Sequence, residues 1–227
     1  MDTLIAEDLL LLLLDDEKGT IRGSSYLSTA LGGAVLIELA LAESIEMAEK
    51  TSVWRTAKVR ALDAPGPSDP VLVDGLATVN EKERSAQDLV TRLGKGLKET
   101  LTERLVQRGL VHRQEDKVLG VFHRTRWPAA DAAHEHDVRR KVTAVLVEGA
   151  QPDPRTGALV ALLAAIDQVH RVIDHEGLSS REVKKRAKAI GEGDWAAKAV
   201  RDAVAASVTA VTAAVTAVAI GAAVGGG

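Results

Sequence analysis

The chain has 227 residues, which is enough for one large domain with a sizeable core. Hydrophobic residues make up 46% of it but aromatic residues only 2%, so the core is expected to consist of Leu, Val, Ile and Ala. The net charge of −3 gives no overall attraction to nucleic acid or to acidic membranes. The absence of cysteine excludes disulfides, thiolate zinc sites and thiol nucleophiles, and it fits a reducing cytoplasm.

The N-terminal segment LIAEDLLLLLLDDEKG predicts a first core helix, capped at Thr3 and ending near Gly19. Its leucine run is flanked by acids and no basic segment precedes it. A secretory signal has the opposite flanks, so we interpret the segment as part of the core.

The stretch Leu27–Leu41, LSTALGGAVLIELAL, predicts the central helix, with Glu38 as its only charge. A helix that is apolar on every face is buried in a large core or in a membrane, and about 15 residues are fewer than the ~20 that cross a bilayer. We therefore expect a core helix, with the serine pair at 24–25 supplying the N-cap. The glycine pair at 32–33 indicates a place where another backbone or a ligand comes close.

After the central helix, alternating residues in 45–50 and 53–62 predict a β-hairpin. The Pro- and Gly-rich segment 63–70 is a loop, and 71–80 and 86–93 have short helical patterns. In Lys95–Gln107, leucines recur at i, i+4 and i+8, which predicts an amphipathic helix that Gly109 ends.

A second hairpin is predicted from 110–112 and 118–123, with the polar segment QEDK as its turn. Its returning strand, VLGVF, is apolar on both faces. Such a strand is either covered by the fold or exposed as a loop that meets a membrane or a second subunit.

The C-terminal half is predicted to be helical over 130–148 and 158–173, and Ser179 with Glu182 has the form of a capping box for the next helix. The last helix starts near Asp194 and carries no charge from Ala203 onward. Because Ala, Thr and Gly make it only marginally hydrophobic, we expect a buried core helix with a frayed glycine tail. A membrane anchor is the alternative.

The histidines do not have metal-site spacing. His134 and His136 lie two residues apart, with His112 and His123 on the second hairpin, whereas helical metal pairs usually lie four apart. The segment around Gly94 lacks the spacing of a phosphate-binding loop, and the scattered carboxylates assemble no catalytic set. We therefore expect no enzyme, no cofactor and no metal.

Two lysines have the spacing of an anion site. Lys95 and Lys98 follow Arg92 at intervals of three, which places the lysines on neighbouring turns of one helix face. They form either an ordinary solvated face or a pair of ammonium groups that holds a phosphate.

Taken in order, AEDLLLLLLDDEKG, ALGGAVLIELAL, LDAPGPSDPVLVDGL and ETLTERLVQRGLV resemble the Golgi phosphoprotein 3 family, from about Leu4 to about Val215. The Ala-, Val- and Gly-rich composition resembles the bacterial branch of that family. The resemblance implies a mainly α-helical single domain over 1–220, with a central buried helix bundle ringed by amphipathic helices and short β-hairpins. A flexible glycine-rich tail is expected over 221–227.

The resemblance also implies a non-enzymatic, cytoplasmic protein that associates peripherally with membranes. Eukaryotic members bind phosphatidylinositol 4-phosphate and retain glycosyltransferases by gripping their cytosolic tails. The expected partners are therefore an anionic membrane lipid surface, the cytosolic tails of membrane proteins, and a second copy of the chain bound through the second hairpin.

The family's lipid pocket uses a tryptophan and an arginine near the central helix, plus two arginines three residues apart. The resemblance places the tryptophan at Gly23 and the first arginine at Gly32, so both side chains are lost here. It places the two paired arginines at Lys95 and Lys98, which keep the positive charge but lack the planar guanidinium. We therefore expect the lysines to hold an anionic head group loosely. The second hairpin matches the family loop that inserts into membrane or mediates self-association, and its apolar residues are Val118, Leu119, Val121 and Phe122.

Two other functions stay open at this point. One is a bacterial protein-interaction scaffold without lipid binding. The other is a winged-helix-like nucleic-acid binder, since a hairpin follows the helix at 95–107. Glu99 and Glu103 make that helix a poor face for phosphates, so no nucleic-acid partner is expected.

Overall fold

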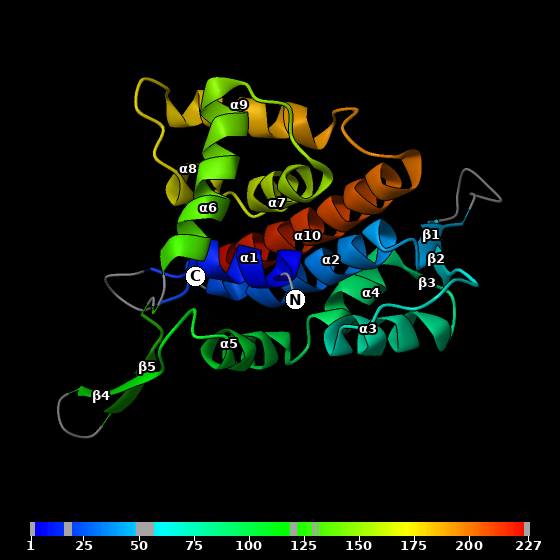
Figure 1. The fold of residues 1–227 in the computed structure, drawn as a ribbon, viewed down its shortest axis with the longest axis horizontal. Helices are drawn as coiled ribbons and strands as arrows, with labels where there is room; N and C mark the ends of the chain where they lie inside the picture. Colours follow the sequence, from blue (N-terminus) through cyan, green and yellow to red (C-terminus); the bar gives the residue numbers. More distant parts are fainter. Residues whose placement is uncertain are drawn as a thin grey trace.

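The computed structural model describes residues 3–15, 20–48, 57–118, 122–128, 130 and 132–224. Helices dominate these residues, which confirms the predicted mainly α-helical class (Figure 1). The helices are α1 (Ile5–Leu13), α2 (Ser24–Leu41), α3 (Pro70–Asn80), α4 (Ala86–Leu93), α5 (Leu97–Gln107), α6 (Ala132–Thr143), the π-helical turn η1 (Ala144–Glu148), α7 (Pro154–Ala165), α8 (Val169–Val172), α9 (Ser180–Gly191) and α10 (Lys198–Val224). The strands are β1 (Ile45–Met47), β2 (Lys58–Ala61), β3 (Arg84–Ser85), β4 (Gln114–Val118) and β5 (Phe122–Arg126).

The central position of α2 is confirmed. It packs against α10, α4, α1, α3, α7 and α5, and every residue from 30 to 40 is buried. The predicted serine caps are wrong. Gly23, with a φ of +69°, is the N-cap, and Ser24 and Ser25 are the first two helical residues. Glycine adopts this left-handed conformation without the strain that a serine would suffer there.

Two glycines let α2 and α4 touch backbone to backbone. A β-carbon on Gly32 would lie 2.0 Å from the carbonyl oxygen of Val90, and one on Gly94 would lie 1.9 Å from that of Ser28. The Ser28 hydroxyl donates a hydrogen bond of 2.7 Å to the Gly94 carbonyl. The close approach predicted for the 32–33 pair is therefore confirmed, and the neighbour at Gly32 is protein backbone.

The first helix is shorter than predicted but buried over its whole length. Leu4 is its N-cap, while the Thr3 hydroxyl donates to Asp8 Oδ1 at 2.7 Å, so the predicted cap at Thr3 is wrong. The helix ends at Leu13 because Leu14 has extended backbone and pairs with Ile21 in an isolated antiparallel bridge. Residue 19, the predicted end, lies outside the described residues.

Buried charges connect α1 to α5 and α3. The fully buried Glu7 carboxylate accepts from Arg104 Nε at 3.2 Å, and the two terminal nitrogens of Arg104 lie 2.8 and 2.7 Å from the Asp69 oxygens. Asp69 also caps α3 by accepting from the Val71 amide. Burial opposes ionisation of Asp69, but the hydrogen bonds from Arg104 and the backbone outweigh it and lower the pKa of this carboxyl.

The amphipathic helix predicted over 95–107 is confirmed as α5, which starts at Leu97. Its three predicted core leucines, at i, i+4 and i+8, are buried, and Gly109 follows its end with a φ of +70°. The helices predicted over 71–80 and 86–93 are confirmed as α3 and α4.

A small antiparallel sheet of order β1-β2-β3 closes one end of the bundle. The first hairpin is confirmed in its pairing, with Glu46 opposite Arg60 and an ion pair between them. Its strands are shorter than predicted within the described part, and residues 49–56 lie outside it. The third strand, Arg84–Ser85, was not predicted, because two residues carry no recognisable strand pattern.

The second hairpin exists, but its predicted register is wrong. The segment QEDK is not the turn; it forms most of β4, which pairs with β5 so that Asp116 lies opposite Arg124 and Val118 opposite Phe122. The connection falls at 119–121, which includes the predicted apolar residues Leu119 and Val121 and lies outside the described residues.

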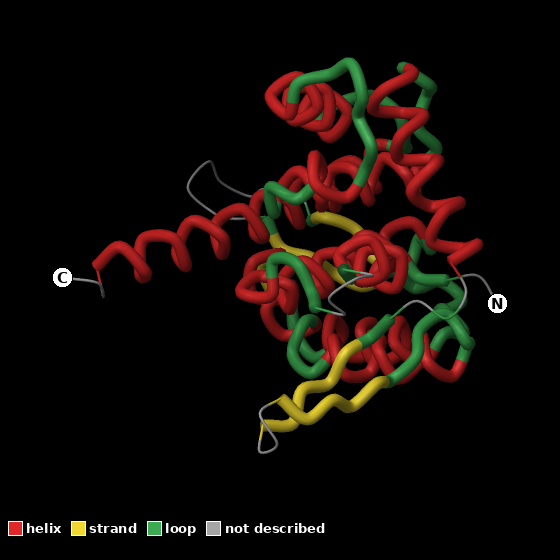
Figure 2. Tube along the Cα trace, turned by 90° about the vertical axis from the view of Figure 1, so that its left-hand side faces the viewer, coloured by secondary structure: helices red, strands yellow, loops and turns green. Residues whose placement is uncertain are grey.

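The last helix divides into two parts. From Val200 to Val211 one face of α10 is buried against α2, α4 and α7, whereas every described side chain beyond Val211 is partly or fully exposed. Figure 2 shows this second part projecting from the body of the molecule. The predicted core helix is confirmed for the first part. The helix continues through Val224, into the predicted tail, and 225–227 lie outside the described residues.

Candidate functional site

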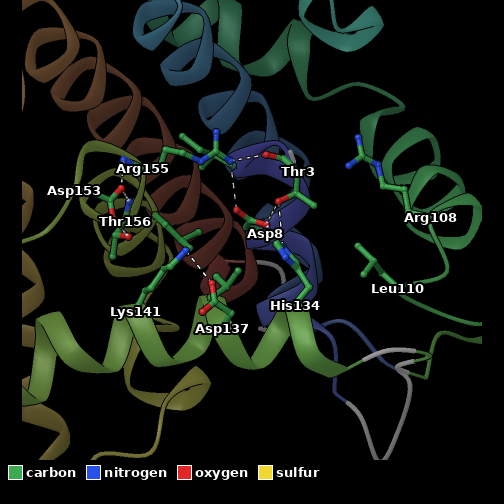
Figure 3. Close-up of a pocket in the computed structure, with 13 residues that line it drawn as sticks. Thr3, Asp8, Arg108, Leu110, His134, Asp137, Lys141, Asp153, Arg155 and Thr156 are labelled. Atoms are coloured by element: carbon green, nitrogen blue, oxygen red, sulfur yellow. Dashed lines mark hydrogen bonds and ion pairs between the residues drawn. The ribbon is translucent and has the colours of Figure 1, made fainter. Parts of the chain in front are cut away.

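A hollow of about 700 Å³ lies between the start of α1, one face of α6 and the start of α7 (Figure 3). The residues from α6 recur at i, i+3, i+4 and i+7, so a single helical face lines one wall. Charged and polar side chains dominate the lining, which comprises Thr3, Ile5, Asp8, Arg108, Leu110, His134, Asp137, Val138, Lys141, Asp153, Arg155, Thr156 and Leu159.

The floor of this hollow is a network of charged groups that satisfy one another. Asp8 accepts from the Thr3 hydroxyl at 2.7 Å, lies 2.8 Å from His134 Nε2, and lies 3.4 Å from an Arg155 terminal nitrogen. Arg155 also donates to the Thr3 carbonyl and to Glu38, the one charge of the central helix. Glu38 in turn accepts from the Ile5 amide at 2.5 Å.

This network has the residue types of a nucleophilic triad but not its geometry. In a triad the base contacts the nucleophile with one ring nitrogen and the orienting carboxylate with the other. Here a single nitrogen, His134 Nε2, lies 3.1 Å from Thr3 Oγ1 and 2.8 Å from Asp8 Oδ1. The arrangement fixes side chains and joins α1, α2, α6 and α7, but it provides no relay for proton transfer from Thr3.

Burial raises the pKa of Glu38, although the Arg155 guanidinium and the Ile5 amide partly offset this effect. The carboxylate therefore depends on Arg155 for its charged form. Glu38 therefore has a structural role, because both of its carboxylate oxygens already accept hydrogen bonds from the protein.

The predicted lysines lie on either side of the start of α5. Lys95 and Lys98 are both exposed, and Lys98 Nζ lies 4.0 Å from Glu99 Oε1. They do not converge on one cavity. Lys95 lines a hollow of about 270 Å³ between α3, α4 and α5, with Arg92 and Asp74, whereas Lys98 lines a different hollow on the other side of α5.

The start of α5 itself is uncapped. Gly96 is its N-cap, with a φ of +73°, and it has no side chain that could accept from the first amides. Such a helix start carries positive potential from its free N–H groups. Arg92 is held by Asp88, whose two oxygens each lie 3.0 Å from its Nε. The ammonium group of Lys95 has no ion pair within the described part of the chain, so the lysines and the helix start form a locally positive ledge.

A hollow at the base of the second hairpin was missed by the sequence reasoning. It has a volume of about 490 Å³ and is lined by Lys98, Glu99, Thr102, Glu103, Val106, Gln107, Arg113 and Trp127. The guanidinium carbon of Arg113 lies 5.9 Å from the centroid of the Trp127 ring. The two residues flank the paired strands, with Gln114 opposite Arg126, so the hairpin register brings them together.

The remaining predicted positions contribute less to this geometry. The backbones of Val118 and Phe122 pair at the far end of the second hairpin, and Leu119 and Val121 lie outside the described residues. Among the residues that the structure describes, no cluster of three or more His, Asp or Glu side chains could hold a metal ion.

The sequence profile of the family described as Golgi phosphoprotein 3 (GPP34) matches residues 5–207, nearly the whole chain. This chain belongs to the Golgi phosphoprotein 3 family. No curated protein matches the chain. The family match covers α1 through residue 207 of α10 and ends before the part that projects.

Glycine fits the local structure at both positions where the resemblance places pocket residues. At Gly32 the α4 backbone occupies the space that any side chain would need. At Gly23 a β-carbon would lie 2.5 Å from the Tyr26 ring, and the backbone φ of +69° disfavours a tryptophan. Neither position can accept the family's residue without movement of its neighbours.

Two described helices of this family member are long and apolar enough to cross a bilayer by length and composition. They are α2 and the segment Val200–Val218 of α10. The first is the central helix of the fold, and the second is the helix whose far part projects.

Proposed function

We propose that this chain is a non-enzymatic peripheral membrane protein that binds anionic lipid head groups at the start of α5. The observation that carries the proposal is the positive ledge formed by Lys95, Lys98 and the uncapped helix start at Gly96. Helix N-termini with adjacent cations are recurrent binding sites for phosphate groups. Membership of the Golgi phosphoprotein 3 family favours the same role.

The affinity expected of this ledge is modest. Each basic residue near an anionic bilayer contributes about 1 kcal/mol, so two lysines contribute about 2 kcal/mol, or roughly 30-fold. Two lysines on different sides of a helix do not enclose a head group, so selectivity among anionic lipids is expected to be low. Reversible association with a cytoplasmic membrane face follows.

Co-sedimentation with vesicles tests this proposal. Vesicles of phosphatidylcholine, with and without phosphatidylglycerol or phosphatidylinositol 4-phosphate, are compared for the wild type and for the double variant Lys95→Glu/Lys98→Glu. We expect binding that rises with anionic lipid content, falls with salt, and weakens by at least about tenfold in the variant.

A matched control makes the same charge change elsewhere. The double variant Lys185→Glu/Lys188→Glu alters two exposed lysines of α9, on the opposite side of the molecule from α5 in Figure 1. It is expected to bind vesicles nearly as well as the wild type. Binding that ignores anionic content, or that weakens equally in both double variants, would remove the proposal. Stoichiometric capture of one protein without lipid dependence would then favour the scaffold function.

A further inference from the structure

The hollow at the base of the second hairpin carries charges of both signs. On the α5 side, Lys98, Thr102 and Val106 recur at i, i+4 and i+8, and Glu99 and Glu103 occupy the adjacent row. On the hairpin side, Arg113 lies over the face of Trp127. The described residues of the lining therefore combine two cations, two carboxylates and an aromatic ring, and the formal charges of these residues sum to zero.

This balance distinguishes the hollow from the positive ledge at the start of α5. A purely anionic ligand inside the hollow, beside Arg113, would also face Glu99 and Glu103, both of which are exposed. Like charges facing one another in this way oppose binding. A purely cationic ligand would in turn face the positive charges of Lys98 and Arg113. A ligand that carries a phosphate and an ammonium a few bonds apart satisfies both signs at once.

We infer that this hollow binds a zwitterionic phospholipid head group, of the phosphocholine or phosphoethanolamine class. Lys98 and Arg113 face its phosphate, and Glu103 with Glu99 faces its ammonium. Trp127 and Val106 provide apolar contact for the methyl or methylene groups, as tryptophan does where one side of a ring is wet and the other apolar. The volume of about 490 Å³ is ample for one such head group.

The position of Arg113 makes it the better defined of the two cations. Stacking on an aromatic face restricts a guanidinium, and a planar guanidinium matches the oxygen geometry of a phosphate. Lys98 is half-exposed, with a flexible stem, and its nearest carboxylate oxygen is 4.0 Å away. We therefore assign the main phosphate contact to Arg113 and a supporting one to Lys98.

This inference rests on the proposed function, because the ligand is a component of the same bilayer. It adds a contact of different chemistry to the anionic one at the ledge, and Lys98 borders both. The ledge would supply attraction to an anionic surface, and the hollow would engage the zwitterionic lipids that surround the anionic ones.

The test uses soluble probes, so that it does not depend on vesicle binding. Phosphocholine, methyl phosphate and tetramethylammonium are titrated into the full chain, and NMR shifts of the Trp127 indole N–H and of the α5 amides are followed. We expect saturable binding of phosphocholine, with methyl phosphate and tetramethylammonium each about tenfold weaker because each lacks one half of the ligand.

Three variants separate the two halves of the hollow. Arg113→Gln and Glu103→Gln each remove one charge without changing the shape much, and each is expected to weaken phosphocholine binding by about tenfold. Lys185→Gln, at an exposed position of α9, is the matched control and is expected to leave phosphocholine binding unchanged. Unchanged thermal unfolding in each variant shows that the fold is intact.

The two proposals fail in different ways. Methyl phosphate that binds as tightly as phosphocholine, and whose binding is weakened by Arg113→Gln, would make the hollow a simple anion site and overturn the inference. So would the lack of saturable phosphocholine binding, or binding that is insensitive to both Arg113→Gln and Glu103→Gln. The anionic proposal fails instead if vesicle binding ignores anionic content. Vesicles of pure phosphatidylcholine distinguish a head group in a bilayer from free phosphocholine, and weaker binding to them by Arg113→Gln supports the lipid as the source.

Discussion

The helices α2 and α10 are alike in composition but differ in burial. The 18-residue window of α2 has a mean hydropathy of 1.4 and the segment of α10 has 1.3, yet 67% of the first is buried and only 33% of the second. The reason is the number of neighbours. α2 is enclosed by six other helices. The last fully buried residue of α10 in the described part is Val211, Val215 still packs partly against the core, and the helix then projects from the body (Figure 2).

This difference shows that apolar composition permits burial without determining it. The central helix even buries a carboxylate, Glu38, because Arg155 and the Ile5 amide are placed to receive it. The projecting part of α10 has no charged residue to bury and still remains exposed. Packing partners, supplied by distant parts of the chain, decide the outcome.

Truncation of one aliphatic side chain on each helix would sharpen this comparison most. Leu36 of α2 is fully buried, and Leu36→Ala is expected to lower the free energy of unfolding by about 2–5 kcal/mol, because it leaves a cavity. Val218 of α10 is 45% exposed, and Val218→Ala is expected to change it by less than about 0.5 kcal/mol. Chemical denaturation followed by circular dichroism measures both.

Comparable losses of stability in Leu36→Ala and Val218→Ala would contradict the difference in burial between the two helices. They would mean that the far part of α10 is covered in solution. In that case sedimentation velocity would show a larger species than the monomer. The wild type and Val218→Ala are otherwise expected to sediment alike.

Removal of the partner of Glu38 is the next largest expected effect. Arg155→Met leaves the buried Glu38 carboxylate without its guanidinium partner. It is expected to lower the free energy of unfolding by about 3 kcal/mol near pH 8. This is the lower end of the usual range for a broken buried ion pair, because Arg155 is partly exposed. Burial already raises the Glu38 pKa above the ordinary 4.5, and loss of Arg155 raises it further. The folded variant then binds a proton more tightly than the unfolded chain.

The sign of the pH dependence follows from that raised pKa. Stability contributed by a protonated Glu38 is present at low pH and is lost as pH rises through its folded pKa. The deficit of Arg155→Met relative to the wild type should therefore shrink as pH falls from about 8 toward about 5. The double variant Glu38→Gln/Arg155→Met serves as the control. Because it has no carboxyl at position 38, its loss of stability should change little with pH on account of this residue. A deficit that grows on acidification would contradict the assignment.

Much of the fold could be predicted because its main signals are local. The leucine spacing of α5, the uniform apolarity of α2 and the serine before α9 each identify an element from a few adjacent residues, and Ser179 indeed accepts from the Glu182 amide. The strand pairings could not be predicted in this way. QEDK has the composition of a turn, and it becomes a strand because its partner segment lies opposite in register.

The candidate site was predictable in its charges but not in its grouping. Lys95 and Lys98 were predicted on one helix face, but Lys95 precedes the N-cap of α5 and the two line different hollows, which helical spacing alone could not show. Arg113 and Trp127 were missed because they are distant in sequence and meet only across the paired hairpin. The available signal was their placement on either side of the paired strands, Arg113 just before β4 and Trp127 just after β5, which becomes visible once the register is known.

The smallest of the expected effects concerns the contact on which the central position of α2 depends. Gly32→Ala places a methyl group where the Val90 carbonyl oxygen would be only 2.0 Å away, so α2 and α4 must separate. Alanine is the better helix former by about 1 kcal/mol, which offsets part of the clash. A net loss of about 1–3 kcal/mol in the free energy of unfolding is therefore expected.

The matched control for this prediction is Gly66→Ala, where the nearest side-chain atom, Leu76 Cδ2, is 3.6 Å from the added carbon. It is expected to be neutral within about 0.5 kcal/mol, because that distance is ordinary van der Waals contact. Equal stabilities for Gly32→Ala and the wild type would mean that α4 can move away from α2 at no cost. The start of α5 follows α4 directly, so such freedom would also shift Lys95 and Lys98. The measured loss at Gly32 therefore reports how firmly the ledge is held against the central helix.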